Sequence, residues 1–180
     1  MRGFRNLALG VALLFMTDLA SVARNVKSDY DHNVDFSRIH TYSWGKIATL
    51  DPVYSERIKS TVDKDLQGKG FQFLTSGGDV TIFARSNVHS RQELEAFYKG
   101  FSGRVAQWGW GGWAGGACGE ASANPGPGKL VIDVFDGNSR TLLWRGCADE
   151  GQPASPDKNA PDAGSDLESM LKTLPPDKSR

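Results

Sequence analysis

The stretch that decides the fold runs from Lys129 to Glu150 and reads KLVIDVFDGNSRTLLWRGCADE. Leu130, Ile132 and Val134 occupy alternate positions in its first part, which is the period of a β-strand. Residues 136–139 then supply turn chemistry, because Asp, Gly and Asn tolerate a positive φ. A second apolar run follows at once, so the stretch predicts a β-hairpin.

Parity predicts the register of this hairpin. A two-residue turn would leave Leu142 and Trp144 on the wrong face of the return strand. A three-residue turn over 137–139 instead places Val134 opposite Leu142 and Ile132 opposite Trp144, so that one face is apolar throughout.

The other face of the hairpin is mixed, since Val131, Phe135 and Leu143 lie beside Asp133 and Arg145. We therefore expect a partial cover there as well. A two-stranded hairpin is marginal in water, so more strands and a helix must pack on it.

A long amphipathic helix is predicted before the hairpin. Asp51 is a suitable N-cap and Pro52 a suitable first helical residue, while Gly68 or Gly70 would end the helix. Its apolar stripe recurs every four residues, at Tyr54, Ile58, Val62 and Leu66.

Further strands are expected on both sides of this helix. Residues 26–44 predict two short extended pieces, the second ending near Trp44, and residues 46–50 predict a loop. Residues 71–74 predict a short strand and residues 79–89 a long alternating one. In the long strand Val80, Ile82, Ala84 and Val88 would point inward, and Thr81, Arg85 and Asn87 outward.

The C-terminal part predicts a second helix. Residues 151–164 form a polar linker, and Ser165 to Glu168 (SDLE) is a capping box. A helix of this length is not stable alone, so it must dock on the sheet. Residues 91–101 are ambiguous, although Leu94 and Tyr98 could share a helical face. The apolar stripe of the C-terminal helix is Leu167, Met170, Leu171 and Leu174.

Together these elements predict an α+β protein, a two-layer α/β sandwich with a mixed, mainly antiparallel sheet and two helices packed on one face. A single domain over residues 24–180 fits the length of 180 residues. The formal net charge is zero, so composition gives no electrostatic footprint for nucleic acid or an anionic membrane.

Residues 1–23 are typical of a secretory signal peptide. Arg2 and Arg5 precede an apolar run over 7–16, and Ser21-Val22-Ala23 forms a small-x-small cleavage site. The run is too short for a membrane span. We therefore expect export across the inner membrane, to the periplasm or the outer envelope, and no transmembrane span in the mature chain.

The two cysteines, Cys118 and Cys147, could form a disulfide in an oxidising compartment. Closing a loop of about 30 residues would stabilise the fold by about 3–4 kcal/mol in the chain-entropy model. The alternative is two unpaired thiols. No cysteine follows the apolar run, so the sequence lacks a lipid-acceptor residue there.

The loop over 108–128 is rich in Gly and contains Trp108, Trp110 and Trp113. Clustered indoles on a loop could stack on a glycan or peptide, or settle at a membrane interface. The structural alternative, which we favour, is that the rings fold back over the mixed face of the hairpin.

The sequence offers no convincing catalytic, cofactor or metal site. Asp29, Asp31 and Asn33 are spaced like the start of a calcium loop, but Val34 replaces the required Gly and His40 the bidentate Glu, which favours turn and cap chemistry. The three histidines lack metal-ligand spacing. Residues 109–114 match a relaxed dinucleotide fingerprint without its strand and helix, and no nucleophile elbow is present. Besides His40, the histidines of the chain are His32 and His89.

Several short motifs together resemble one family. They are Asp29-Tyr30-Asp31, Asp35-Phe36-Ser37, Thr41-Tyr42-Ser43-Trp44, Gly68-Lys69-Gly70-Phe71, Asp79-Val80, residues 130–134, residues 143–146 and Leu174-Pro175-Pro176. Their order resembles that of the domain-of-unknown-function 4136 family of bacterial envelope proteins, over about Val26 to Pro176. The resemblance implies a two-layer α/β sandwich in the cell envelope, often lipid-anchored, with no established activity and no catalytic residues.

We therefore expect an exported, non-enzymatic envelope protein that binds a partner protein or a cell-wall component. The alternative is a glycan- or small-ligand-binding protein that uses Trp108, Trp110 and Trp113.

Overall fold

The computed structural model describes residues 26–86, 91–101, 129–149 and 163–174. Among them, no helix is long and apolar enough to cross a membrane. In chain order the elements are β1 (Lys27–Tyr30), the short 3-10 helix η1 (Phe36–Arg38), β2 (Thr41–Ala48), α1 (Pro52–Gly68), β3 (Gln72–Phe73), β4 (Val80–Arg85), α2 (Arg91–Phe97), β5 (Lys129–Asp136), β6 (Leu142–Asp149) and α4 (Ala163–Leu171).

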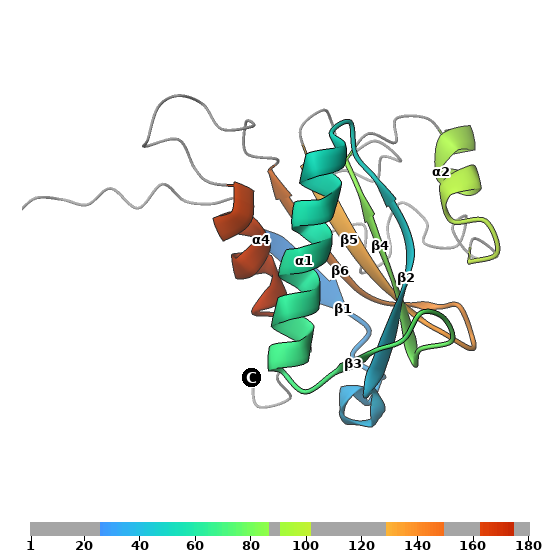
Figure 1. Ribbon diagram of the computed structural model, residues 1–180. Coiled ribbons are helices and arrows are strands. Elements are labelled where there is room, and N and C mark those ends of the chain that lie inside the picture. The colour runs from blue at the N-terminus through green and yellow to red at the C-terminus, as the bar shows by residue number, and fades with distance from the viewer. Residues whose placement is uncertain (1–25, 87–90, 102–128, 150–162, 175–180) are drawn as a thin grey trace, which may run out of the picture.

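Six strands form one sheet in the order β1-β6-β5-β4-β2-β3. The pairings of β1 with β6, β6 with β5 and β5 with β4 are antiparallel. Those of β4 with β2 and β2 with β3 are parallel. Figure 1 shows α1 and α4 on one side of the sheet and α2 on the other. The predicted α+β sandwich with a mixed sheet and two helices on one face is confirmed.

The first helix begins and ends as its sequence predicts. The side chain of Asp51 accepts a hydrogen bond from the N–H of Val53 at 2.9 Å, Pro52 is the first helical residue, and Gly68 is the last. Its predicted stripe is buried at Ile58 and Val62, both 0% exposed.

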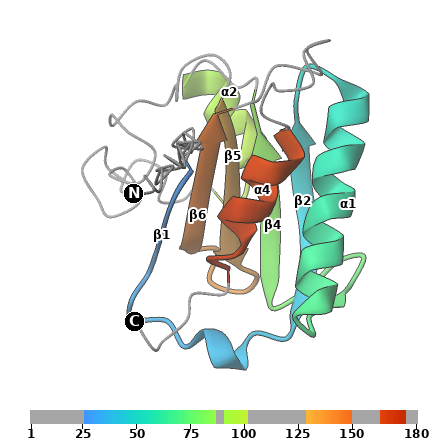
Figure 2. The same ribbon diagram turned by 90° about the vertical axis from the view of Figure 1, so that its left-hand side faces the viewer.

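The C-terminal helix docks as expected but begins earlier than predicted. The stripe of α4 is buried at all four positions, and it packs beside α1 against β6 (Figure 2). The helix starts at Ala163, so Ser165 lies inside the first turn and the predicted capping box is wrong. Lys69 strengthens the contact, because its ammonium group donates to the carbonyls of Leu171 and Leu174 at the end of α4.

The hairpin forms, but in a different register. Val134 pairs with Trp144 and Phe135 with Leu142, with a bulge between the two pairs. The predicted three-residue turn, which would pair Val134 with Leu142, is therefore wrong. The bulge adds one residue to β6, so Trp144 stays on the face of Val134 while Leu142 moves to the other face.

The side chain of Asp136 explains why the turn is longer. One of its carboxylate oxygens accepts the N–H of Asn138 at 2.9 Å and that of Ser139 at 2.6 Å. Arg140 then takes a φ of 59°, an uncommon value for a residue with a side chain. This local hydrogen bonding competes with the shorter turn that parity favoured.

Strand lengths also differ from the sequence pattern. The second strand continues past Trp44 to Ala48, so residues 46–48 are not a loop. The long strand expected over residues 79–89 covers only Val80–Arg85 among the described residues, and residues 71–74 give the two-residue β3. Pairing with a neighbour sets these ends, because β2 runs beside β4 up to the pair Ala48 and Arg85.

Both faces of the sheet are buried. The larger core lies under α1 and α4 and contains Ile132 and Trp144, both 0% exposed, together with Leu143. The expectation that Leu143 faces the other way is wrong because of the bulge. The smaller core lies on the second face and consists of Phe83, Leu94, Phe97, Tyr98, Phe135 and Leu142.

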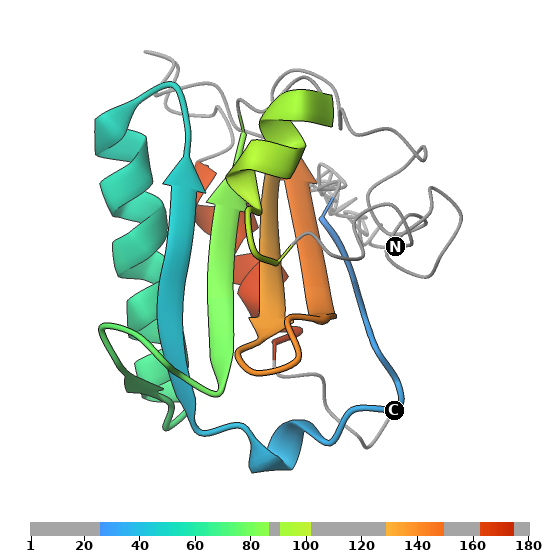
Figure 3. The same ribbon diagram turned by 90° about the vertical axis from the view of Figure 1, so that its right-hand side faces the viewer.

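The side of β4 that the sequence predicted to be polar and exposed is buried on the second face of the sheet. All six residues of that strand are buried, including Thr81 at 8% and Arg85 at 5% exposed. Their predicted outward position is wrong, because α2 crosses this face over β4 and β5 (Figure 3). The ambiguous segment is therefore a helix, and Leu94 and Tyr98 are both buried against the sheet.

Candidate functional site

A buried polar cluster lies on the second face, beside the smaller core. Asp133 of β5 is 0% exposed and accepts two hydrogen bonds from the guanidinium of Arg145 on β6, the one from Nη2 at 3.0 Å. The hydroxyl of Tyr98, directly after α2, donates to the same carboxylate. Arg85 of β4 donates from Nε to that hydroxyl at 2.9 Å. We call Arg85, Tyr98, Asp133 and Arg145 the second-face cluster.

The strand register brings this cluster together. Asp133 pairs with Arg145 across β5 and β6, in the alternation that also places Phe135 and Val131 on the second face. The two strands thus hold the carboxylate and the guanidinium side by side. Tyr98 joins them because the apolar side of α2 packs against Phe83 and Phe135.

An aromatic wall borders the cluster and excludes water from it. The ring of Phe83 lies 5.7 Å from that of Phe97, 5.3 Å from Tyr98, 5.1 Å from Phe101 and 5.3 Å from Phe135, measured between ring centroids. Most of these pairs are edge-to-face, the arrangement that aromatic rings prefer. Such a dry setting strengthens the electrostatic interactions of the neighbouring charges.

The environment keeps the charges of the cluster fixed near neutral pH. Burial raises the pKa of Tyr98 above its ordinary value, and Asp133 raises it further against the opposing effect of the two arginines. Burial alone would lower the pKa of Arg145, but the adjacent carboxylate of Asp133 holds it above its usual range. Tyr98 therefore stays protonated and Arg145 stays cationic, so neither can serve as a general base.

A second polar cluster lies on the opposite face, between α1 and β2. Asp63 accepts hydrogen bonds from Tyr42 and Trp44, both at 2.9 Å, and from Lys59 at 2.7 Å. Burial would raise the pKa of Asp63, but these three donors outweigh it and hold the pKa below its ordinary value. Burial also raises the pKa of Tyr42 to about 12. All these groups are satisfied by each other, so this cluster fastens α1 to the sheet.

Residues 26–176 match the family profile described as Domain of unknown function (DUF4136). The chain belongs to the DUF4136 family. The resemblance drawn from short motifs is thereby confirmed, and no curated protein matches this DUF4136 chain.

Solved structures share the fold of this DUF4136 chain at low sequence identity. A DUF4136 family protein from Bacteroides thetaiotaomicron is 15% identical, with a TM-score of 0.56, over 84% of this chain and 96% of that one. A PDZ domain protein from Parabacteroides distasonis is 16% identical, with a TM-score of 0.47, over 86% of this chain and 36% of that one. The PelC dodecamer from Paraburkholderia phytofirmans is 7% identical, with a TM-score of 0.43, over 83% and 95%.

The acidic N-terminal segment of this DUF4136 chain performs turn and cap chemistry, as predicted. One oxygen of Asp31 accepts from the backbone and side chain of Asn33, at 2.9 and 3.0 Å. Asp35 caps η1 by accepting from the N–H of Ser37 at 3.2 Å. Within the described ranges, no three His, Cys, Asp or Glu side chains gather where they could hold a metal ion.

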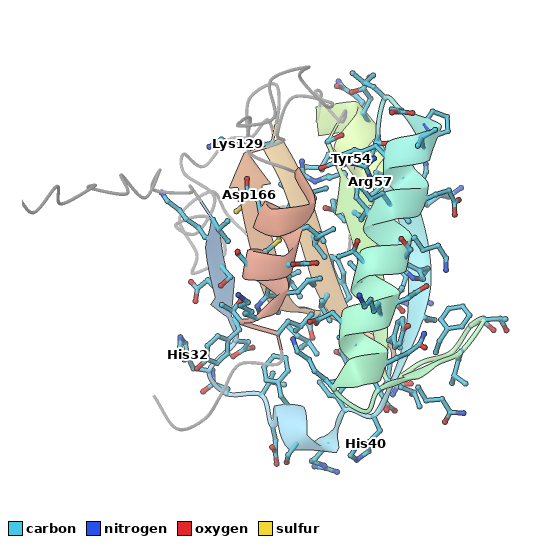
Figure 4. The ribbon with its side chains drawn as sticks, turned by 60° about the vertical axis from the view of Figure 1, so that its left-hand side comes forward. His32, His40, Tyr54, Arg57, Lys129 and Asp166 are labelled. Carbon is cyan, nitrogen blue, oxygen red and sulfur yellow. The ribbon has the colours of Figure 1, made fainter. Side chains whose placement is uncertain are left out.

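Two histidines lie apart from the second-face cluster. Figure 4 shows His32 and His40 at the same end of the molecule, at separate points of the connection between β1 and β2. The side chain of His32 is 70% exposed and its ring lies 4.2 Å from that of Tyr30. His89 lies outside the described residues.

Other predicted features also lie outside the described residues. They are the signal peptide, residues 151–162 of the linker predicted over 151–164, Cys118 and the three tryptophans Trp108, Trp110 and Trp113. The last two residues of that predicted linker belong to α4 instead. Cys147 is described and lies in β6, paired with Val131 and 3% exposed. Its disulfide with Cys118 stays a prediction.

Sequence reasoning missed the second-face cluster. The signal was present, because Asp133 interrupts an apolar run between Ile132 and Val134, and Arg145 follows Trp144 in an equally apolar strand. Charged residues in such positions are buried only when paired. What the sequence did not offer was Tyr98 and Arg85, whose segments meet these strands only in the folded chain.

Proposed function

We propose that this protein is an exported, non-enzymatic binding module of the bacterial cell envelope. The observation that carries the binding part is the fixed protonation of the second-face cluster. Tyr98 and Arg145 keep one protonation state around neutral pH, and both oxygens of Asp133 are already engaged. Such a site holds charge in place rather than moving protons, which suits recognition.

Export is supported by the N-terminal sequence, in which two arginines, an apolar run and a small-x-small site follow one another. The test is expression of the full chain in a bacterium, followed by fractionation and intact mass measurement. We expect a periplasmic or envelope-bound protein that begins at Arg24. A cytoplasmic protein that retains residues 1–23 would overturn the export part.

Binding is tested with purified mature protein immobilised at a defined lysine and exposed to fractionated envelope material. A variant whose cluster is broken should fail to capture the partner, so an Asp133→Asn variant serves as the comparison. Glu56→Gln, which removes an exposed carboxylate of α1, is the matched control. Retention of the same species by all three proteins would contradict a role for the second face.

The alternative is binding of a glycan or small ligand through Trp108, Trp110 and Trp113. Three indoles within six residues favour it. Tryptophan fluorescence with cell-wall fragments distinguishes the two. A spectral change that disappears in Trp110→Ala would support the alternative, whereas an unchanged spectrum would argue against it.

A further inference from the structure

The second-face cluster carries more positive than negative charge. It contains two guanidinium groups, those of Arg85 and Arg145, and one carboxylate, that of Asp133. The fourth member, Tyr98, is neutral because its pKa is raised. The cluster therefore has a net charge of about +1 in a region that is almost closed to water.

The excess charge belongs to Arg85. Arg145 forms a two-bond pair with Asp133, and Tyr98 donates a third hydrogen bond to that carboxylate. Among the described residues, Arg85 donates a hydrogen bond only to the Tyr98 hydroxyl, through Nε. An arginine has five N–H donors. For the other four, no acceptor occurs among residues 26–86, 91–101, 129–149 and 163–174.

Nearby carboxylates of the described chain do not fill this place. Glu93 and Glu95 of α2 are both exposed. Asp29 of β1 pairs in register with Arg145, but its carboxylate accepts from the N–H of Tyr30 at 2.9 Å. Arg85 is 5% exposed and its hydrogen-bond partner Tyr98 is neutral, so within the described part of the chain its guanidinium has no hydrogen-bonded partner of opposite charge.

A single carboxylate would complete the site. One negative charge balances the excess, and its two oxygens match the paired N–H groups along one edge of a guanidinium. A phosphate dianion would reverse the imbalance in a setting of low dielectric. Because Arg85 keeps only 5% of its surface, the ligand must present its carboxylate on a narrow end.

We propose that Arg85 anchors a carboxylate-binding site at the end of β4, where α2 crosses the sheet (Figure 3). Tyr98 and Asp133 are its positioning residues. The hydroxyl of Tyr98 donates to Asp133 and keeps a lone pair for Nε of Arg85, which fixes the guanidinium plane. The site deepens the binding function proposed above and rests on that proposal for its physiological meaning.

Purified protein dialysed into a chloride buffer tests the site. Acetate is titrated by calorimetry at constant ionic strength, with phosphate in a second arm and further chloride in a third. We expect saturable acetate binding, weaker phosphate binding and no saturable response to chloride. Loss of a charge-assisted hydrogen-bonded contact in Arg85→Met should raise the Kd for acetate roughly 10- to 100-fold.

One further variant separates the effect of the paired N–H groups of Arg85 from the effect of its charge, and a second variant is the control. Arg85→Lys keeps the charge but loses the paired N–H edge, so it should bind acetate more weakly than the wild type and more tightly than Arg85→Met. Arg57→Met is the matched control, because Arg57 is an exposed arginine of α1 on the other side of the sheet (Figure 4). Its acetate affinity should equal that of the wild type.

A measurement on the wild-type protein covers the case in which Arg85→Met does not fold. The nitrogen NMR resonance of Arg85 Nε should shift on addition of acetate and saturate at the calorimetric Kd. The proposal is overturned by absence of saturable acetate binding, by tighter binding of phosphate, or by a carboxylate of this chain found on Arg85. A protein that binds acetate through Arg85 but is not exported would overturn only the proposed function.

Discussion

Replacing Asp133 by Asn tests how much the second-face cluster contributes to the stability of the fold. The substitution keeps the shape of the side chain but removes the carboxylate to which both Arg145 and Tyr98 donate. Asp133 is 0% exposed and the side chain of Arg145 is 13% exposed, so solvent cannot replace the lost charge.

The expected loss follows from that burial. Removing one partner of a buried ion pair costs about 3–5 kcal/mol, because the other charge is left uncompensated. For a domain of this size, that loss corresponds to a fall in Tm of roughly 6–20 °C. An exposed substitution such as Glu56→Gln should change stability by no more than about 0.5 kcal/mol.

Urea unfolding followed by circular dichroism measures these losses, and a double-mutant cycle assigns them. Arg145→Met alone should also destabilise the protein. The double variant should lose about 2–3 kcal/mol less than the sum of the two single losses, because it leaves neither charge of the pair stranded. A loss below about 1 kcal/mol in Asp133→Asn, or strictly additive losses in the double variant, would refute the reasoning.

Three further outcomes follow from other parts of the structure. Gly146→Ala should destabilise the protein by about 1–3 kcal/mol in the same assay, because a Cβ there would collide with the indole of Trp144; wild-type stability would contradict this packing. Asp63 has a folded-state pKa below its ordinary 3.8, so its contribution is complete above that value and is lost as the pH falls through the folded pKa. The difference in unfolding free energy between wild type and Asp63→Asn should therefore shrink between about pH 6 and about pH 3, and a constant difference would exclude this linkage. If Cys118 and Cys147 are bonded, a reducing agent should lower stability by about 3–4 kcal/mol and the oxidised protein should show no free thiol; two titratable thiols would rule the bond out.

Local signals in the sequence were sufficient to predict α1 and α4, the helices that cover one face of the sheet. Asp51 and Pro52 start α1 because capping and a fixed φ act within one turn of chain. The four-residue spacing of α1 and the stripe of α4 predicted which sides are buried, since an amphipathic face has one way to leave water. The family followed from the same short motifs, read in order.

The hairpin shows where local signals stop being sufficient. Alternation identified both strands, but the register depended on a bulge after Leu142 and on how Asp136 closes the turn. A bulge exchanges the faces of a strand without changing its composition. Parity therefore placed Ile132 and Trp144 correctly in one core and misplaced Leu142 and Leu143.

By itself, the sequence determined the elements that depend on neighbouring residues: the start of α1, the helical stripes, the presence of the strands and the α+β class. Only the tertiary structure decided that α2 covers the second face and that this face contains a charged cluster. Tyr98 lies 13 positions after Arg85 and 35 before Asp133. No periodicity spans such separations, because the free energy that brings these groups together comes from packing α2 on the aromatic wall. The imbalance of charge at Arg85 is a consequence of that packing, and it appears only when all four side chains are placed.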